Sequence, residues 1–526
     1  MARRRTDWKI GTLDFETDPF SKGQHVYPFA GCVYIDDHHH VTWGVDCVAD
    51  LVSVLNSLPD CKIYAHNGGK FDFHFLLDYA NRDNVKIING RIAQLQIGNC
   101  VLIDSFLLMP FGLAAYSKTE IDYSKFVVKL REKNKVEIIE YLKDDCKKLH
   151  ELLTGFLAVT GNKLTIGSAA FAAQKKMGVI IPECGEQHDI RFREFYFGGR
   201  CQAFKTGVFE DEPFDYVDIN SAYPAAMLEP HPAFTGYAYS DSFDIDELGA
   251  NFVTVRAVSR GAFPVRIPGE SLAYPDDDIT RVYNITGWEL KAAIETDSIE
   301  ILDVLEFRKP KKLINLRAFV ETYYQKRLDA EARGDLISKM AYKFLLNSGY
   351  GKYATDPREF QDWVIADAGD IVAGHDYHST VGRTAFWTKS AYHGRGWYDV
   401  ATSASITGLV RANLWRAIKT VDTAHYCDTD GILCKSGAKL PFSKKLGEWK
   451  LEGVGTEFVI AGKKIYGVTF DENGKKVQKT ACKGARLSYN EIVEVARGGT
   501  VRHLKDAPSF SVKYGQRPVE RNIRSK

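Results

Sequence analysis

The sequence predicts an α/β domain followed by a larger α+β region. In roughly the first 150 of the 526 residues, apolar strand-like runs alternate with helical ones. A stretch around residues 181–192, which contains Pro, Gly and mixed charge, is the candidate linker. Beyond it the pattern changes to α+β, and the length suggests two to four domains.

The elements of the first domain are expected in a strand-and-helix order. Residues 8–17, 61–67 and 99–110 are strand-like, and the last of these ends in an exit loop. Residues 70–80 begin a helix, and residues 137–157 form an amphipathic helix. This order predicts a mixed sheet with helices packed on it.

Composition excludes several classes of protein. Hydrophobic residues make up 45% and charged residues 26%, which is typical of a globular protein. Polar residues and a proline interrupt the most apolar stretch, 101–116, which is too short to span a bilayer, and no secretory apolar region follows the basic start. The ten cysteines contain no CxxC pair, which favours free buried thiols over disulfides or a zinc site. We therefore expect a protein of the cytoplasm.

Net charge is only +1, but basic residues gather at 308–312 and in the last 25 residues. Such patches on a near-neutral chain fit a protein that holds a phosphate backbone in one groove, although most charge runs are solvated surface.

A first group of acids lies in the α/β domain. Asp14 and Glu16 alternate on a strand and so share one face. Asp72 follows in HNGGKFD, and Tyr141 and Asp145 stand one helical turn apart. Each acid alone could be a surface group, but together they could hold two Mg²⁺ or Mn²⁺ ions for phosphodiester hydrolysis, one activating water and one stabilising the leaving oxygen.

A second group of acids lies in the α+β region. Asp218, in DYVDINSAYP, follows a strand-like run and precedes a turn at Pro224. Asp428 and Asp430 stand in HYCDTDGIL, where DTDG is typical of a hairpin tip. Asp218 and Asp430 could clamp two Mg²⁺ ions for nucleotidyl transfer.

Between these acids lies the helical segment KFLLNSGYG. Lys339, Lys343 and Asn347 follow each other at intervals of four residues on one helix face, where they could grip phosphates. The aromatic ring of Tyr350 could stack near the nascent base pair. A solvated helix face is the alternative for the lysines.

The order of these motifs resembles that of known polymerases. DxE, Asn-x3-Phe-Asp and Tyr-x3-Asp are similar to the three exonuclease motifs of proofreading DNA polymerases, and DINSAYP, Kx3NSGYG and YCDTD resemble motifs A, B and C of family B. YFGG at 196–199, ITGLVR around 407–411 and KKIYG around 464–466 are similar to the YxGG, Tx2GR and KxY elements of protein-primed enzymes. Over nearly the whole chain, the sequence resembles protein-primed family B polymerases of small linear-genome bacteriophages, and in particular the tectivirus type.

The resemblance implies a fold of two main parts. A ribonuclease-H-like 3′→5′ exonuclease domain would span residues 1–185, and a right-hand polymerase domain residues 186–526. Within the second part, the implied divisions are palm 190–240 and 400–440, fingers about 317–352, thumb about 445–526, a terminal-protein-contacting insertion about 240–316, and an insertion about 354–399 that encircles the duplex.

The resemblance also implies roles for individual residues. Metal ligands would be the first-group acids together with Asp218, Asp430 and the carbonyl of Ile219, with Tyr141 and Asp428 completing the catalytic set. Nucleotide contacts are implied for Tyr223 (the steric gate), Lys326, Lys339, Lys343, Asn347 and Tyr350. DNA contacts are implied for Thr17, Asn67, Phe71, Ser105, Tyr196, Gly198, Gly199, Ser221, Gly351, Thr407, Arg411, Lys464 and Tyr466.

The function implied is replicative DNA-directed DNA synthesis with proofreading, which starts on a separate terminal protein in the cytoplasm of a bacterial host. Partners would be template and primer DNA, dNTPs and the terminal protein, for a chain that acts as a monomer. Alternatives are a polymerase that uses RNA or no primer, and an inactive DNA-binding scaffold. Two positions depart from the family pattern: Ala222, beside the steric gate, replaces a larger apolar residue, and Val410 replaces the glycine of Tx2GR.

Overall fold

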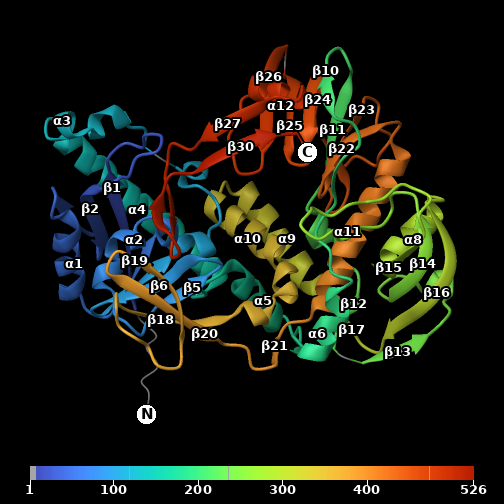
Figure 1. The fold of residues 1–526 in the computed structure, drawn as a ribbon, viewed down its shortest axis with the longest axis horizontal. Helices are drawn as coiled ribbons and strands as arrows, with labels where there is room; N and C mark the ends of the chain where they lie inside the picture. Colours follow the sequence, from blue (N-terminus) through green and yellow to red (C-terminus); the bar gives the residue numbers. More distant parts are fainter. Residues whose placement is uncertain (1–7, 118, 235, 473, 526) are drawn as a thin grey trace.

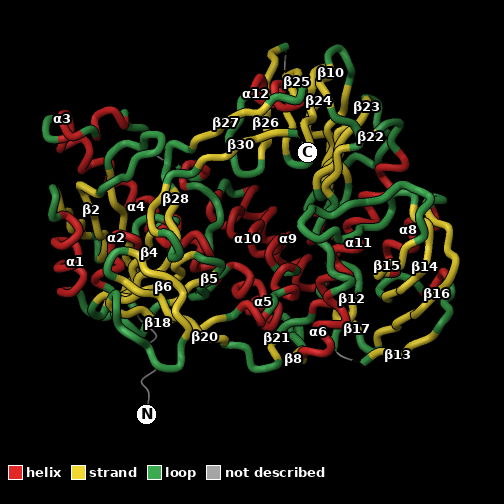
Figure 2. The backbone as a smooth tube through the Cα atoms, viewed as in Figure 1, coloured by secondary structure: helices red, strands yellow, loops and turns green. Residues whose placement is uncertain are grey.

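The structure is a computed structural model that describes residues 8–117, 119–234, 236–472 and 474–525 (Figures 1 and 2). The N-terminal domain is built on a seven-stranded mixed sheet of order β3-β2-β1-β4-β7-β6-β5. Only the β1–β4 and β4–β7 pairs are parallel, so the mixed sheet expected from the sequence is confirmed. Its strands are β1 (Lys9–Thr17), β2 (Pro28–Ile35), β3 (His38–Trp43), β4 (Cys61–Ala65), β5 (Lys86–Ile88), β6 (Arg91–Ile97) and β7 (Cys100–Asp104).

Helices cover both faces of this sheet. Alternate residues of β2 enter two different buried clusters: Val33 packs with helix α1 (Cys47–Ser57), and Cys32 packs with helix α4 (Lys135–Thr160). This follows from the two-residue period of a strand, which turns successive side chains to opposite faces. The domain is therefore a three-layer α/β/α arrangement. The shorter helices are α2 (Phe73–Leu76), α3 (Val128–Arg131) and α5 (Ile166–Lys176).

A second large sheet, called the central sheet below, is built from strands between residues 201 and 482. It has eight antiparallel strands in the order β26-β25-β24-β11-β23-β22-β9, with β10 paired to β24. The long helix α11 (Val400–Thr420) is buried along most of its length beside this sheet. The strands are β9 (Cys201–Ala203), β10 (Gly207–Phe209), β11 (Phe214–Ile219), β22 (Ala424–Asp428), β23 (Gly431–Lys435), β24 (Trp449–Gly462), β25 (Ile465–Glu472) and β26 (Lys475–Cys482).

Two smaller sheets and a helix pair lie between the strands of the central sheet in sequence. The first small sheet, of order β13-β16-β14-β15, carries α8 (Gly287–Glu295) against α11, and the second has the order β18-β20-β19. Helices α9 (Arg317–Ala332) and α10 (Leu336–Ser348) pack on each other, and α10 also packs on α4. The strands of these two sheets are β13 (Tyr237–Ser240), β14 (Phe252–Ser259), β15 (Arg281–Thr286), β16 (Ile299–Pro310), β18 (Gln361–Asp367), β19 (Asp376–Val381) and β20 (Thr384–Ser390). Two further strands of this region, β12 (His231–Pro232) and β17 (Leu313–Ile314), pair with each other, and β21 (Arg395–Trp397) belongs to another two-stranded sheet.

The C-terminal segment returns to the N-terminal domain. Figure 1 shows β27 (Thr500–Leu504) and β30 (Glu520–Arg524) reaching across from the region of α12 (Tyr489–Ala496). The hairpin of β28 (Ser509–Ser511) and β29 (Gly515–Arg517) ends there, with the ring of Phe510 5.3 Å from that of Phe71. Ser379 of the second small sheet donates a hydrogen bond to the Val512 carbonyl oxygen at 2.6 Å. Three parts of the chain that are distant in sequence therefore meet at this hairpin.

Several other expectations can be compared with the described residues. The candidate linker contains regular structure, because β8 (Glu183–Gly185) pairs with β21 and is followed by α6 (Glu186–Arg193). All ten cysteines are free, and eight are buried. Among the described residues, no helix combines the length and apolarity that crossing a membrane requires.

Candidate active sites

The first group of acids comes together on one face of the N-terminal sheet, near the C-terminal end of β1. Asp14 and Glu16 extend from the same face of β1, and Asp145 approaches from α4, which packs on that face. One side-chain oxygen from each of the three lies within 4.8 Å of the others. Three carboxylates at this separation can share divalent cations.

Asp72 lies beside this cluster, at the N-cap position of the short helix α2. Its side chain is fully buried, and its Oδ1 accepts a hydrogen bond from the Phe15 backbone N–H at 3.2 Å. Burial and the neighbouring Asp14 carboxylate raise the pKa of Asp72 well above its usual value. A nearby cation would offset both effects and favour the ionised form.

A pocket of about 490 Å³ opens directly onto these acids. Thr17, Phe71 and Tyr141 line it with Asp14, Glu16 and Asp145. The hydroxyl of Tyr141 lies 3.0 Å from that of Tyr123, a lining residue that sequence reasoning missed. The wall therefore combines carboxylates with aromatic rings on which a base could stack.

Asn67 and Ser105 are placed differently from the other predicted strand-holding residues. The Asn67 side-chain oxygen accepts a hydrogen bond from Arg91 at 2.8 Å, and Arg91 also pairs with the buried Asp104. Ser105 is fully buried and donates to the Ala65 carbonyl oxygen. Their contact with DNA stays a prediction, and Arg91 is a positioning residue that no motif indicated.

The second group of acids is assembled by strand pairing. Asp218 on β11 lies opposite Gly431 on β23, and the Ile219 N–H donates to the Asp430 carbonyl oxygen at 2.9 Å. The tight β22–β23 hairpin, which the DTDG sequence predicted, is confirmed. Burial and the Asp430 carboxylate raise the pKa of Asp218 to about 7, and burial and Asp428 raise the pKa of Asp430 to about 6.

Basic residues surround these acids. Lys464 forms an ion pair with Asp428, which supports a positioning role for Asp428. Lys450 Nζ lies 4.0 Å from Asp218 Oδ1, a contact that no sequence motif indicated. The predicted primer-gripping Tyr466 is largely buried, with its hydroxyl 3.2 Å from that of Tyr216.

The predicted nucleotide-binding side chains lie on α7 (Ala222–Ala226), α9 and α10, except that of Tyr350, which follows the end of α10. The rings of Tyr223 and Tyr350 stack in parallel, with centroids 4.0 Å apart and an interplanar angle of 5°. The side chains of Lys326, Lys343 and Asn347 are exposed, while Lys339 forms an ion pair with Glu331 at 2.6 Å.

One arginine on α9 was missed. Arg327 donates a hydrogen bond to Ser221 Oγ at 3.1 Å, which ties α9 to the segment that follows Asp218. The sequence offered only one indication that Arg327 belongs to the site, which is its position next to Lys326. Gly351, also predicted to contact DNA, begins a short 3₁₀ helix at Gly351–Ala354.

The YFGG loop approaches the DTDG hairpin closely. A Cβ atom at Gly199 would lie 2.9 Å from the Tyr223 hydroxyl oxygen and 2.8 Å from Thr429 Cγ2, so only glycine fits without a shift. The carbonyl of Tyr196 accepts a hydrogen bond from Arg266, whereas a Cβ at Gly198 would meet open space.

Thr407 and Arg411 are buried inside the protein. Arg411 pairs with Glu289 of α8 at 2.8 Å and donates to the carbonyl oxygens of Phe197 and Gly198. Thr407 donates to the Ala404 carbonyl oxygen within α11. A direct contact of either side chain with DNA stays a prediction. The structure instead supports Arg411 as a residue that positions the YFGG loop, and Glu289 as a partner that sequence reasoning missed.

Residues 116–393 match the family described as DNA polymerase type B, organellar and viral, and the chain therefore belongs to this family. It is of the phage type. The DNA-directed DNA polymerase of Enterobacteria phage PRD1 is 34% identical over 99% of both chains. The DNA polymerase of Bacillus phage phi29 is 23% identical, with 95% of this chain and 93% of that one covered.

Solved structures of phi29 DNA polymerase share this fold. The complex with single-stranded DNA has a TM-score of 0.75 and 17% identity, and it covers 99% of this chain and all of that one. The complex with primer-template DNA and incoming nucleotides has a TM-score of 0.74 at 18% identity, with the same coverage. At these identities, the likeness shows the fold.

The Glu289–Arg411 pair can be tested against an exposed pair on the same two helices. Replacement of Glu289 by Gln should lower the free energy of unfolding by about 3 kcal/mol, because it leaves a buried guanidinium without its carboxylate. Glu295→Gln, which breaks the exposed pair with Arg416 at 2.6 Å, should cost less than about 1 kcal/mol. Chemical denaturation of both variants measures the difference, and equal losses would contradict the positioning role.

The raised pKa of Asp218 predicts a pH dependence in the metal-free protein. The folded-state pKa of about 7 lies above the unfolded value, so this carboxyl group progressively destabilises the fold as pH rises from about 4 through 7. The melting temperature of Asp218→Asn relative to wild type should therefore increase between about pH 5 and about pH 8 in chelator. Asp422→Asn is the control, because Lys435 lowers the pKa of that exposed group. A difference for Asp218→Asn that does not change with pH would refute the assignment.

Proposed function

We propose that the chain is a replicative DNA-directed DNA polymerase that also proofreads, with the two reactions carried out at separate carboxylate sites. The observation that carries this proposal is the presence of two acidic clusters on two different sheets. Asp14, Glu16 and Asp145 gather on the N-terminal sheet, and Asp218 and Asp430 on the central sheet. The family assignment supports polymerase chemistry.

The residues of the central cluster fit a pair of Mg²⁺ ions. Asp218 and Asp430 lie close together although both carboxylates are partly buried. Burial raises the pKa of both groups, with a further contribution from Asp430 at Asp218 and from Asp428 at Asp430, and a cation would offset these effects. Carboxylate oxygens and the Ile219 carbonyl are donors that Mg²⁺ or Mn²⁺ prefers. When bound, the ions would activate the primer 3′-hydroxyl and neutralise the triphosphate.

Side chains of α7, α9 and α10 would select the nucleotide. The exposed Lys343 and Lys326, with Lys339, would bind the triphosphate and stabilise charge on the leaving pyrophosphate. Tyr223, fixed by its stack on Tyr350, would exclude a ribose 2′-hydroxyl. Arg327 would hold Ser221, and so the motif that carries Asp218, in place.

The N-terminal cluster would perform 3′→5′ hydrolysis with a second pair of ions. Its pocket exposes Asp14, Glu16 and Asp145 beside Thr17, Phe71 and Tyr141, which would hold a frayed single strand by stacking rather than by reading its sequence. Asp72, buried behind Asp14, would supply the fourth carboxylate.

The domain layout of the proposal follows the observed elements. The ribonuclease-H-like exonuclease domain corresponds to the α/β/α domain and the palm to the central sheet, while α9 and α10 correspond to the fingers. The thumb corresponds to the C-terminal segment, whose hairpin contacts Phe71 and the second small sheet. This contact supports an arrangement that encircles the duplex and favours processive, strand-displacing synthesis.

Protein priming is the part of the proposal that rests on family likeness. The first small sheet occupies residues 237–310, where terminal-protein contact was expected, and the PRD1 polymerase covers it in alignment. An inactive scaffold fits poorly, because all seven predicted carboxylates are present and six are grouped into the two clusters or lie directly beside them.

Variants that remove carboxylates from one cluster at a time should separate the two activities. Asp430→Ala should reduce dNTP incorporation on a primed template by more than about a thousandfold, because a carboxylate that holds the ions is lost, and should spare hydrolysis of single strands. The double variant Asp14→Ala and Glu16→Ala should do the reverse. Loss of both activities in each folded variant would refute two independent sites.

An initiation assay tests the choice of primer. With a candidate terminal protein, template ends and labelled dNTPs, we expect covalent labelling of that protein by the wild type and none by Asp430→Ala. Parallel reactions with an RNA primer and with no primer are the controls. Efficient extension only from RNA, or synthesis without any primer, would overturn protein priming and leave the polymerase assignment intact.

A further inference from the structure

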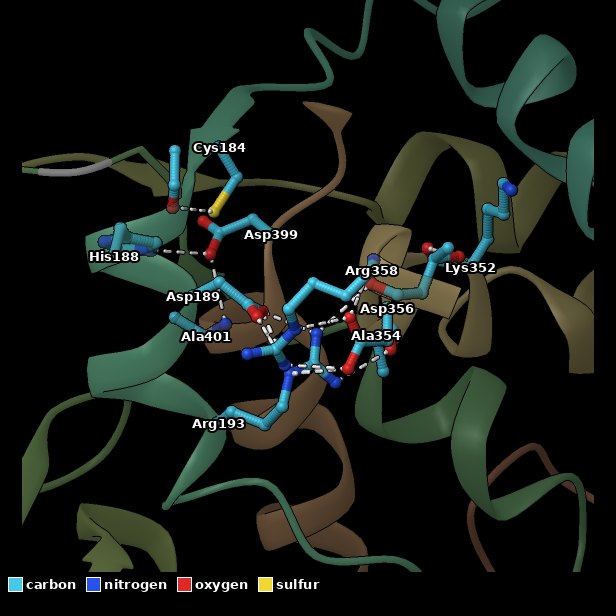
Figure 3. Close-up of polar contacts among 12 residues, drawn as sticks. Cys184, His188, Asp189, Arg193, Lys352, Ala354, Asp356, Arg358, Asp399 and Ala401 are labelled. Carbon is cyan, nitrogen blue, oxygen red and sulfur yellow. Dashed lines mark hydrogen bonds and ion pairs between the residues drawn. The ribbon is translucent and has the colours of Figure 1, made fainter. Parts of the chain in front are cut away.

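A group of potential metal ligands lies outside both carboxylate sites. Cys184 is the middle residue of the short strand β8, His188 follows four residues later in α6, and Asp399 caps the N-terminus of α11. One ligand atom from each lies within 4.8 Å of the others, and all three side chains are buried or nearly so (Figure 3).

The bonds already formed orient these ligands. His188 Nε2 lies 3.0 Å from Asp399 Oδ1, which also accepts the Ala401 backbone N–H at 3.0 Å. Cys184 Sγ lies 3.7 Å from the Gly185 carbonyl oxygen and also interacts with the Tyr398 side chain. The helix cap therefore fixes the Asp399 carboxylate while its second oxygen remains available.

That second oxygen is the observation that points to a ligand. Within the described chain, Asp399 Oδ2 is buried and has no hydrogen-bond partner, and Figure 3 shows it turned toward the Cys184 sulfur. The hydroxyl of Tyr237, whose ring lies 5.9 Å from that of His188, is likewise buried without a partner. Buried carboxylate oxygens are seldom left unpaired, because removal from water without a new partner is costly.

Neighbouring charges do not compensate Asp399. Arg193 and Arg358 lie nearby in Figure 3, but they pair with Asp189 and Asp356 in a network whose four charges balance. Among the described residues, His188 is thus the ion-pair partner of Asp399. A bound divalent cation would supply the missing positive charge.

We propose that Cys184, His188 and Asp399 form a zinc site at the junction of the N-terminal domain and α11. Sulfur, imidazole and carboxylate together are donors that suit Zn²⁺ and are poor for Mg²⁺. Tetrahedral Zn²⁺ places its ligand atoms about 3.5 Å apart, so only small side-chain shifts are needed. The sequence favoured free thiols because these ligands are not arranged as CxxC.

Access and coordination number are also consistent with zinc. A pocket of about 460 Å³, lined by Gly185 and His188 among others, leads from the surface to the His188 side of the group. A water molecule would supply the fourth ligand. On binding, the thiol proton leaves to solvent.

The bound ion would cross-link two parts of the chain that are distant in sequence. Cys184 and His188 belong to the segment that follows the N-terminal domain, whereas Asp399 begins the helix that carries Arg411. Bound zinc would therefore stabilise the arrangement of the two carboxylate sites relative to each other, and it would take no part in their chemistry.

Cobalt provides a direct test. The full chain, stripped of metal and kept in excess Mg²⁺, is titrated with Co²⁺, which gives a near-ultraviolet charge-transfer band only when a thiolate binds. We expect the band to saturate at one equivalent in the wild type, to be lost on addition of Zn²⁺, and to be absent in Cys184→Ser. Cys482→Ser, which changes a thiol outside the group, is the matched control and should keep the band.

A second variant keeps the test valid if Cys184→Ser misfolds. His188→Gln should weaken Co²⁺ binding at least about tenfold, and Zn²⁺ should raise the melting temperature of the wild type by about 2 °C or more and leave that of His188→Gln unchanged. Absence of the band in folded wild type, or an equal band in Cys184→Ser, would overturn the proposal.

Discussion

The fold has to hold carboxylates of like charge close together in partly buried positions. In the central sheet, pairing of β11 with β23 places Asp218 beside Asp430, and burial together with neighbouring carboxylates raises the pKa of both groups. Backbone hydrogen bonds on both sides of β11 stabilise this arrangement. A bound cation would offset this cost. Asp218 lies on β11, and Asp430 lies in the tight turn between β22 and β23, so strand pairing and the hairpin fix both carboxylates.

The N-terminal cluster meets the same constraint with different elements. Asp14 and Glu16 come from one strand, and Asp145 comes from a helix that packs across it. The two clusters are built from different elements, but one buried core joins them, because it contains Leu149 and Leu152 of α4 together with Ile219 of β11. They are joined through α10, which packs on α4, and through the C-terminal hairpin, which contacts Phe71. Transfer of a DNA end between two such sites would need no rearrangement of either sheet.

Local patterns predicted parts of each cluster from short spacings, whereas the meeting of Asp218 with the distant Asp430 was expected from the resemblance to motifs A and C. Alternation on a strand placed Asp14 with Glu16, and the helical period placed Tyr141 with Asp145. Long-range partners were not predictable in this way: no spacing links Glu289 to Arg411, or Cys184 to Asp399, because only the folded chain brings them together. The burial of Arg411 was missed for the same reason, since its motif indicates a helix face and not what covers it. The sheet at 237–310 carried no motif, because its apolar strands serve packing.

The central claim is that two separate clusters bind divalent cations. The most direct measurement is anomalous diffraction from crystals of the full chain grown with Mn²⁺, primer-template DNA and a non-hydrolysable dNTP. The account predicts Mn²⁺ peaks between Asp218 and Asp430 and separate peaks at Asp14, Glu16 and Asp145. Ordered side chains at both places with Mn²⁺ at only one, or at neither, would contradict it.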